Sequence, residues 1–304
     1  MVRQRTLTPS SSRFESLWAS YASTVVITMV LFCVSNKVIQ LGIVLFKGCV
    51  IMYEIQSRIR FSETDIDGYL TVPAIINYFQ DISTFQSVDV GAMDMEEDGH
   101  PLGWIILSWD IKIDKLPKLG ETVSVKTYPL KANGPFAYRD FTMSIGNEVM
   151  IRAHSIWSII DLDRLMPRKI TDEIMEKYGV DEPLPGKWAG RKLPIPKNKM
   201  EAVRFVVRSF QLDKNGHMNN ERYVSAAIAL LPEGTQIKEV QVGYVAQALL
   251  NDEIIIYRGL NQENADMISS DVASEQKQVF DMDTEVFNLE KVDGSTLCTV
   301  ILMK

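Results

Sequence analysis

The chain has 304 residues, of which 46% are apolar and 23% are charged, a composition ordinary for a folded protein with enough chain for two cores. The formal net charge is −7. It is −11 for residues 52–304, which hold 27 basic and 38 acidic side chains. This acidic balance argues against a nucleic-acid-binding role for the molecule as a whole, so no nucleic acid partner is expected.

Residues 1–51 differ from the rest of the chain. Basic residues precede an uncharged run at 16–36, whose length and flanks are typical of a signal anchor or a signal peptide. Serine and threonine dilute the hydrophobicity of this run, and no small-residue cleavage site stands out. Two interpretations stay open: a membrane anchor, or a non-native or dispensable extension with translation starting at Met52. We favour the second.

A polar turn followed by a helix is predicted at residues 65–91. Thr71 is a suitable N-cap, Pro73 falls in the first turn, where proline is tolerated, and Gly91 ends the helical pattern. Apolar side chains recur at helical spacing and predict one buried stripe. Its members are Ile75, Phe79, Ile82 and Phe85.

Residues 171–200 contain four prolines, which exclude helix or strand interiors, so this segment is predicted to be a surface linker with one short helix at 171–178. The segment is also basic, and so is the start of the following sequence. It is either a solvated linker or a docking face for an acidic partner. The basic residues are Lys187, Arg191, Lys192, Lys197, Lys199, Arg204 and Arg208.

Residues 213–219 repeat the pattern of residues 65–71 at a constant offset of 148. The aspartate and the glycine recur, His217 takes the place of Tyr69, and Asn219 takes the place of the N-cap. Self-similarity at a fixed spacing indicates a duplicated unit. A second helix is predicted to follow, starting at Glu221 and ending at Leu231, with Tyr223, Ala226, Ala227 and Leu230 on its apolar stripe.

The repeat continues into the strands. A strand-turn-strand pattern at 111–125 recurs at 240–256, and long strand-like runs close each copy at 136–161 and 279–303. Gly146-Asn147 and Asp293-Gly294 are predicted as the hairpin turns of these runs. Each copy is therefore predicted to hold a polar turn, a helix and several antiparallel strands, which is an α+β arrangement.

Asp213, Asn215 and His217 occupy every second position, so their side chains face one way if the segment is extended. A carboxylate, an amide and an imidazole beside free backbone N–H groups at a helix start can polarise a carbonyl and activate water. The alternative is a turn rich in Asn and Asp that only caps the helix. Because Tyr69 replaces the histidine in the first copy, we expect the second copy to carry the chemistry and the first to be a scaffold.

Four motifs lie in order along both copies: Arg60–Asp65, Phe136–Phe141, Met166–Ile170 and Asp213–Asn220. With the duplicated pattern of helix and strands, they resemble the acyl-ACP thioesterase family from Met52 to the C-terminus. The resemblance implies two tandem hot-dog domains, each an antiparallel sheet wrapped around a central helix. They are expected at residues 52–170 and 201–304, joined by the linker at 171–200.

The resemblance also implies a function and a catalytic set. The expected reaction is hydrolysis of fatty acyl-ACP thioesters, which releases free fatty acid and terminates fatty acid synthesis, with acyl carrier protein docking on the basic linker. The family assigns catalysis to Asp, Asn and His of the motif, here Asp213, Asn215 and His217, and to a Glu on the following strand. That position, in 242–248, holds Gln247, whose amide can hold water but cannot accept a proton.

Two other functions stay open. One is a hot-dog thioesterase that acts on acyl-CoA esters, and the other is a weakly active acyl-binding module in which Gln247 marks lost catalysis. In the first copy, the helix and the sheet are expected to hold the acyl chain.

No cofactor or metal is expected. His100 and His154 lack ligand-type spacing with cysteine or acidic residues, and no glycine-rich phosphate loop occurs. Cys33 and Cys49 precede residue 52, and Cys298 lies in an apolar strand as expected buried filler. Without a disulfide pattern the sequence fits the cytoplasm, with membrane attachment through residues 16–36 as the alternative. The sequence is also compatible with a homodimer.

Overall fold

The computed structural model describes residues 27–29, 33–34, 37–38, 43–45, 53–259 and 283–304. Contacts within the chain divide it into two units, residues 1–50 and 51–304. In the first unit the described residues form two short antiparallel pairs, β1 with β4 and β2 with β3. Their bounds are β1 (Ile27–Met29), β2 (Cys33–Val34), β3 (Lys37–Val38) and β4 (Ile43–Leu45).

The apolar run at 16–36 is described only at 27–29 and 33–34, which lie in β1 and β2. The rest of the expected anchor lies outside the described residues. Within the described part of the chain, no helix is both long enough and apolar enough to cross a membrane.

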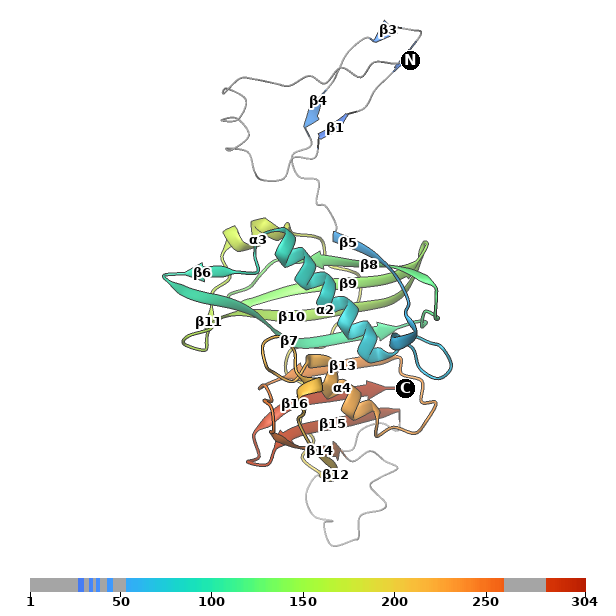
Figure 1. Cartoon of the computed structure of the whole chain (residues 1–304), viewed down its shortest axis with the longest axis vertical. Helices are drawn as coiled ribbons and strands as arrows, with labels where there is room; N and C mark the ends of the chain where they lie inside the picture. The colour runs from blue at the N-terminus through green and yellow to red at the C-terminus, as the bar shows by residue number, and fades with distance from the viewer. Residues whose placement is uncertain (1–26, 30–32, 35–36, 39–42, 46–52, 260–282) are drawn as a thin grey trace. The chain divides into compact units, whose positions relative to one another are not determined.

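The second unit is built on a twelve-stranded antiparallel sheet (Figure 1). Its strands lie in the order β12-β14-β15-β16-β13-β7-β10-β9-β8-β5, with β6 paired to β7 and β11 to β10. Strand β7 belongs to the first copy and β13 to the second, so their pairing joins the two copies into one continuous sheet.

The first copy contributes β5 (Tyr53–Arg58), β6 (Met95–Glu97), β7 (His100–Ile113), β8 (Thr122–Pro129), β9 (Phe136–Ile145), β10 (Glu148–Asp161) and β11 (Met166–Arg168). The second contributes β12 (Lys199–Val206), β13 (Glu239–Tyr244), β14 (Glu253–Gly259), β15 (Thr284–Lys291) and β16 (Thr296–Met303). Both predicted hairpin turns are confirmed, between β9 and β10 and between β15 and β16.

Two helices, α2 (Val72–Asp89) and α4 (Asn220–Ile228), lie next to each other on one face of the sheet (Figure 1). The side chain of Thr71 caps α2 and that of Asn219 caps α4, as the sequence predicts. A third helix, α3 (Asp172–Tyr178), confirms the short helix predicted before the proline-rich segment.

Two details of the predicted helices were wrong. Helix α4 ends at Ile228 and not at Leu231, because its last turn tightens and the Leu231 N–H donates to the Ile228 carbonyl. Phe85 is 47% exposed, whereas Phe79 and Ile82 are fully buried. Since a helix turns about 100° per residue, the three steps after Ile82 carry Phe85 past the edge of the buried stripe.

The duplicated turn is confirmed bond by bond. Residues 65–69 and 213–217 form the same turn, in which the aspartate N–H donates to the carbonyl four residues later at 2.8 Å. The glycine of each turn has a φ of 79°, a conformation that a side chain would strain. Matching 3-10 turns precede them, η1 (Phe61–Glu63) and η2 (Ser209–Gln211).

The turns between the later strands repeat as well. After β7, the Gly120 N–H donates to the Ile59 carbonyl at 3.0 Å; after β13, the Asn251 N–H donates to the Val207 carbonyl at 3.0 Å. Both turn residues have positive φ, 83° for Gly120 and 68° for Asn251. The repeat inferred from sequence therefore extends through the strands of both copies.

The main core lies between the helices and the sheet. Phe79 of α2 packs against Trp109 of β7 and Phe141 of β9, with ring centroids 6.2 and 5.0 Å apart. Cys298 of β16 is fully buried, and burial raises the pKa of its thiol well above the ordinary value. The predicted role of this cysteine as buried filler is confirmed.

Residues 179–198 run without helix or strand, as predicted. The Leu184 N–H donates to Asp140 at 2.7 Å, and the Ala189 N–H donates to Asp110 at 2.6 Å. These aspartates alternate along their strands with residues of the main core, so they point to the opposite face of the sheet. The linker therefore covers the sheet face that the helices leave open.

Candidate active site

One cavity of about 1330 Å³ is lined by both copies. Asp213, Asn215 and His217 line it from the motif turn, and Gln247 lines it from the loop after β13. The remaining wall comes largely from α2, β7 and β9 of the first copy. The four residues that the sequence singled out therefore face one shared space.

The motif turn is closed, so the condition of an extended segment is not met. One carboxylate oxygen of Asp213, Oδ1, accepts the N–H groups of Asn215 at 2.8 Å and His217 at 3.2 Å. This is the Asx turn weighed as the alternative. The closed turn still brings Asp213, Asn215 and His217 to the same cavity. The second oxygen, Oδ2, forms no hydrogen bond with a described residue, so it is available to water.

In the first copy the corresponding carboxylates stabilise the turn and its contact with α2. Oδ1 of Asp65 accepts the N–H groups of Asp67 at 3.0 Å and Tyr69 at 2.8 Å. Glu63 accepts a hydrogen bond from the Tyr78 hydroxyl at 2.9 Å. These contacts agree with the expectation that the acidic residues of this copy form turns.

Gln247 lies in a loop and not in a strand as predicted, because β13 ends at Tyr244. The N–H groups of Val245 and Ala246 both turn to the carbonyl of Leu297, at 2.9 and 3.2 Å. Because two consecutive N–H groups bind the same carbonyl, the regular hydrogen-bond pattern between β13 and β16 ends here. The chain therefore leaves the sheet just before Gln247 and crosses the cavity rim.

Two tyrosines fix this loop to the motif. The Tyr244 hydroxyl donates to the Asn220 carbonyl, and the Tyr223 hydroxyl accepts the Ala248 N–H, both at 2.9 Å. The Met218 N–H donates to the Ala248 carbonyl at 2.9 Å. Burial raises the pKa of both phenols above the ordinary value, so they stay protonated. The backbones that carry the imidazole and the amide are thus held side by side.

The side chains of Asn215, His217 and Gln247 form no hydrogen bond with any of the described residues. Their donors and acceptors are therefore available to a ligand or to water. The site offers one imidazole, one carboxylate oxygen and two amides. That set can position water and a carbonyl group, and it can move a proton.

Helix α2 of the first copy forms part of the wall. Gln80 accepts a hydrogen bond from the side-chain amide of Asn220 at 2.9 Å, which ties α2 to the start of α4. Gln80, Ser83 and Thr84 line the cavity. The copy that lacks the histidine therefore shapes the same cavity.

Trp104 of β7 and Arg139 of β9 also line the cavity. The sequence places Arg139 in the motif Phe136–Phe141 but predicts no role in the site for either residue. A signal was available for the arginine. It alternates along β9 with Ala137 and Phe141, which are both buried on the core face. A charged residue in an apolar series of this kind is rarely buried without a partner.

His154 has an acidic partner that its spacing in the sequence does not indicate. Its Nδ1 lies 2.6 Å from a carboxylate oxygen of Asp140 on the neighbouring strand. The ring stacks between Tyr138 and Trp188, with centroids 6.0 and 5.7 Å away. Trp188 comes from the linker, so this histidine holds the linker on the sheet and faces away from the cavity.

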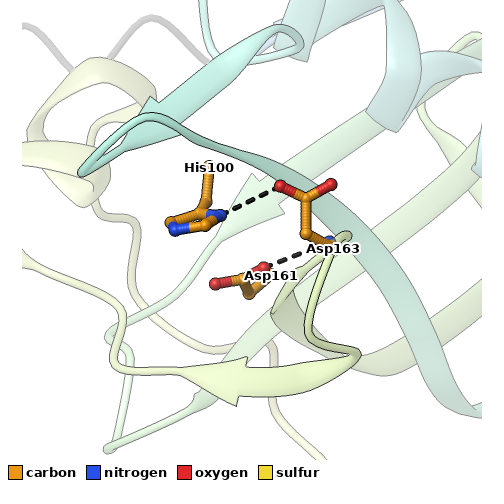
Figure 2. A group of neighbouring side chains, drawn as sticks. All are labelled: His100, Asp161 and Asp163. Atoms are coloured by element: carbon orange, nitrogen blue, oxygen red, sulfur yellow. Dashed lines mark hydrogen bonds and ion pairs between the residues drawn. The ribbon is translucent and has the colours of Figure 1, made fainter.

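His100 also has acidic neighbours that its spacing in the sequence does not indicate, because it lies beside Asp161 and Asp163 (Figure 2). Its Nδ1 is 2.9 Å from Asp163, and Asp161 accepts the N–H groups of Arg164 at 2.9 Å and Asp163 at 3.1 Å. These N–H groups, that of Arg164 first, lower the pKa of Asp161. The three ligand-type atoms lie within 4.8 Å of one another and could hold a cation. The bonds already present close the β10–β11 turn against β7.

The basic residues of the linker and of β12 fall into two groups. Lys199 forms an ion pair with Glu290, and Arg204 forms one with Glu201. The others are exposed and form no ion pair with a described residue. They are Lys187, Arg191, Lys192, Lys197 and Arg208.

Two family descriptions match this chain. The acyl-ACP thioesterase N-terminal domain matches residues 51–178, and the acyl-ACP thioesterase C-terminal domain matches residues 195–288. Together they cover the first copy and most of the second, in the expected order.

Similar plant proteins agree with this. The chain is 25% identical over 189 residues to the chloroplastic palmitoyl-acyl carrier protein thioesterase of Cuphea hookeriana, covering 57% of this chain and 45% of that protein. It is 26% identical over 202 residues to the chloroplastic oleoyl-acyl carrier protein thioesterase 1 of Arabidopsis thaliana, covering 60% and 55%. The chain thus spans about half the length of these relatives.

Solved structures resemble the second unit closely. An acyl-ACP thioesterase from Bacteroides thetaiotaomicron superposes with a TM-score of 0.68 at 20% identity, covering 83% of this chain and 97% of that one. The 12:0-ACP thioesterase from Umbellularia californica gives 0.64 at 17% identity, covering 85% and 98%. At these identities the likeness establishes the fold, and it confirms the predicted α+β architecture of two tandem hot-dog units.

Proposed function

The chain belongs to the acyl-ACP thioesterase family, and from this we propose that it hydrolyses fatty acyl-ACP thioesters to free fatty acid. The observation that carries the proposal is the shared cavity. Polar groups suited to hydrolysis line it from the second copy, and the first copy supplies a long wall for an acyl chain. Its volume of about 1330 Å³ suits a ligand longer than an ordinary small molecule.

The reaction follows from the groups on the cavity wall. Water attacks the carbonyl carbon of the thioester while His217 accepts a proton from it, with the open oxygen of Asp213 sharing the role of base. The amide of Asn215 donates a hydrogen bond to the carbonyl oxygen as negative charge develops there. The C–S bond then breaks, and the leaving thiolate takes the proton from His217. The products are a free fatty acid and the carrier thiol.

Gln247 has a supporting role in this scheme. Its amide oxygen can accept a hydrogen bond from the attacking water and so orient it, but it cannot take the proton. Catalysis therefore rests on Asp213 and His217, with Gln247 as a positioning group.

The decisive experiment measures release of free fatty acid from a chain-length series of acyl-ACP and matched acyl-CoA substrates, with His217→Ala as the inactive control. A higher kcat/KM on acyl-ACP is the expected result. Equal or faster hydrolysis of acyl-CoA would instead identify an acyl-CoA thioesterase. Tight acyl-ACP binding without release in a single turnover would identify an acyl-binding module.

The same proposal leads us to expect a protein partner, acyl carrier protein, and a cellular compartment. Acyl carrier protein is acidic, and the exposed basic residues of the linker supply complementary charge for docking. We expect the enzyme to act in the cytoplasm, because the sequence shows no disulfide pattern, and cell fractionation tests this. We also expect a homodimer, which light scattering of the purified protein tests.

A further inference from the structure

One cluster of ligand-type side chains lies outside the proposed catalytic set (Figure 2). It consists of His100, Asp161 and Asp163. Each offers one atom, an imidazole nitrogen or a carboxylate oxygen, and the three atoms lie within 4.8 Å of one another. Exposed acidic groups often gather without binding anything, so the surroundings of each ligand atom decide whether the cluster is a site.

One carboxylate oxygen of Asp161 is buried without a hydrogen bond. The side chain is fully buried, and its Oδ2 has no hydrogen-bond partner among the described residues. The other oxygen, Oδ1, accepts the N–H groups of Asp163 and Arg164 at 3.1 and 2.9 Å. Figure 2 shows Oδ2 pointing away from these bonds, on the side of the His100 ring. A buried carboxylate oxygen is costly unless a donor or a cation satisfies it, so Oδ2 is an open ligand atom within the cluster.

Arg164 does not satisfy this oxygen. Its Nη1 lies 3.6 Å from Oδ2 of Asp161, which is beyond hydrogen-bond distance, and its side chain is 53% exposed. An ion pair with one partner in solvent contributes little, and a long exposed side chain can move aside. Oδ2 therefore stays accessible to a cation that approaches more closely than the guanidinium group.

The charge around the cluster also favours a cation. Four carboxylates and two guanidinium groups gather at the adjoining turns, so negative charge exceeds positive charge by two before His100 is counted. This excess equals the charge of a divalent cation. The groups belong to Glu97, Asp98, Asp161, Asp163, Arg164 and Arg168.

Paired strands hold the ligand atoms. His100 begins β7 and Asp161 ends β10, and these two strands are hydrogen-bonded neighbours. The Leu162 N–H donates to the Pro101 carbonyl at 2.9 Å, which fastens the turn after β10 to the start of β7. The N–H groups on Oδ1 of Asp161 fix the direction of its carboxylate, as hydrogen bonds behind a ligand do at protein metal sites. The backbone of the cluster is therefore preorganised.

We propose that His100, Asp161 and Asp163 bind a zinc ion or a chemically similar divalent transition-metal ion, with water as the remaining ligand. One imidazole and two carboxylates suit such an ion, whereas Ca²⁺ and Mg²⁺ prefer oxygen ligands alone. In a tetrahedral zinc site the ligand atoms lie roughly 3.4 Å apart. The side chains of His100 and Asp163 are 27% and 56% exposed, which leaves them room to close on the ion.

The ion has a structural role at the rim of the cavity. Pro101 and Leu162 both line the cavity, and each lies next to a ligand residue in the sequence. A cation that joins His100 to the turn after β10 therefore fixes two segments of the rim together. None of the proposed catalytic groups coordinates the ion, so the proposal does not depend on the proposed hydrolysis.

Calorimetry on the full chain, stripped of metal by a chelator, tests binding directly. We expect zinc to bind about tenfold or more tightly than Ca²⁺ or Mg²⁺. The melting temperature should rise by about 5 °C at a free zinc concentration of about 100 times Kd, because the ion binds the folded chain and not the unfolded one. Absence of zinc binding overturns the proposal, as does binding of Ca²⁺ or Mg²⁺ as tight as that of zinc.

Two variants locate the ion. Asp161→Asn keeps an oxygen for the two backbone N–H groups but removes the charge, and His100→Asn keeps a donor for Asp163 but removes the imidazole. Each should weaken zinc binding by about 10²-fold or more, because loss of a group that only supports a ligand already costs about 10- to 100-fold. His154→Gln is the matched control, since His154 is also bonded to an aspartate but faces away from the cavity. It should leave Kd unchanged. Unaltered zinc binding in both Asp161→Asn and His100→Asn overturns the proposal.

Asp163→Asn keeps the proposal testable if Asp161→Asn fails to fold. The exposed Asp163 side chain has its one hydrogen bond within the described part of the chain to His100, and an amide oxygen can still accept it. We therefore expect Asp163→Asn to fold as the wild type does, to bind zinc about tenfold or more weakly, and to lose most of the zinc-dependent rise in melting temperature. A rise as large as that of the wild type at the same zinc concentration overturns the proposal.

Discussion

At the scale of single residues, the two copies differ most at one position of a shared turn. Tyr69 and His217 hold the same place in two turns with the same backbone hydrogen bonds. Tyr69 lies under the ammonium group of Lys118, 4.8 Å from the ring centroid. His217 lines the cavity, and its imidazole forms no hydrogen bond with a described residue. At this position of the turn, the second copy therefore presents an imidazole that can exchange a proton with a ligand, and the first copy does not.

We expect His217→Ala to lower kcat by roughly 10²-fold or more, as loss of a general acid–base group does, and Tyr69→Phe to cost far less. Fatty acid release from acyl-ACP measures both. The two variants sit on equivalent turns, so circular dichroism melting curves control for loss of fold. Losses of similar size in the two variants would contradict the assignment of the chemistry to the second copy.

Gln247 gives a second prediction. Its side chain is exposed and forms no hydrogen bond with a described residue, so Gln247→Glu disturbs no contact in the described structure. A carboxylate at this position adds a proton acceptor beside the cavity. A positioned base typically raises the reaction rate by about 10²- to 10⁴-fold. We expect kcat on acyl-ACP to rise, with a pH dependence that the wild type lacks.

The control for this variant is the same change at Gln211, whose counterpart in the first copy is already Glu63. Gln211→Glu should leave kcat unchanged. A folded Gln247→Glu enzyme that is slower than wild type would show that Asp213 and His217 already form the complete base.

The carboxyl group of Asp110 makes the stability of the fold depend on pH. Burial raises its pKa from 3.8 to about 6; the Ala189 N–H opposes this shift and the nearby Glu239 adds to it. Because folding raises this pKa, the contribution of the Asp110 carboxyl group to the free energy of unfolding is fully present below pH 3.8. It is lost as the pH rises through about 6. Asp110→Asn should therefore raise the free energy of unfolding by about 1–2 kcal/mol at pH 8 and change it little at pH 4.

Urea unfolding at the two pH values measures this effect. The exposed Asp67, whose counterpart in the second copy is Asn215, gives the matched control Asp67→Asn. A loss of stability at pH 8 in Asp110→Asn would mean that the ionised carboxylate is needed to hold the linker at Ala189.

At the scale of elements, the linker does more than connect the copies. Asp140 and Asp110 accept its backbone N–H groups, and Trp188 stacks on His154. Lys112 adds a hydrogen bond to the Lys187 carbonyl at 2.7 Å. The segment is therefore held against the sheet while the side chains of its basic residues stay exposed. A fixed backbone with free charges is suited to docking an acidic protein.

We expect Lys192→Glu with Lys197→Glu to lower kcat/KM on acyl-ACP several-fold at low salt, because neither lysine forms an ion pair with a described residue. The difference should shrink as salt screens the charges. Exchanging the paired residues, Glu201→Arg with Arg204→Glu, keeps the local charge and serves as the control. A kcat/KM that is flat from low to high salt in the wild type would contradict carrier docking at this surface.

At the scale of the whole molecule, the two copies form one body because β7 pairs with β13. Neither copy holds the site alone. The second supplies the motif, the first supplies most of the remaining cavity wall, and the Gln80–Asn220 bond joins their helices. One copy thus carries the histidine, and the other shapes a binding surface.

Contacts within the chain separate residues 1–50 from residues 51–304, and both copies lie in the second unit. We therefore expect a chain that begins at Met52 to fold and to hydrolyse acyl-ACP as fast as the full chain. Thermal melting and kcat/KM on the two chains measure this. Loss of folding in the shorter chain would show that the first unit is needed.

The sequence by itself determined the features that depend on local pattern. Duplication at a fixed offset, helix starts at Thr71 and Asn219, and hairpin turns at 146–147 and 293–294 follow from residue type and spacing. Such features need only neighbours along the chain, because caps and turns are closed by backbone groups a few residues away. The motif at 213–217 was located for the same reason, although the sequence left open whether its backbone is extended or closed as an Asx turn.

The tertiary structure alone decided which distant residues share a space. His154 and Asp140 are on different strands, His100 and Asp163 are 63 positions apart, and Arg139 reaches its hydrogen-bond partners on α2 and β8. Pairing across a sheet depends on register and on the packing of helices against it, which single residues do not encode. The cavity arises in the same way, since its walls come from two copies that are joined at one pair of strands.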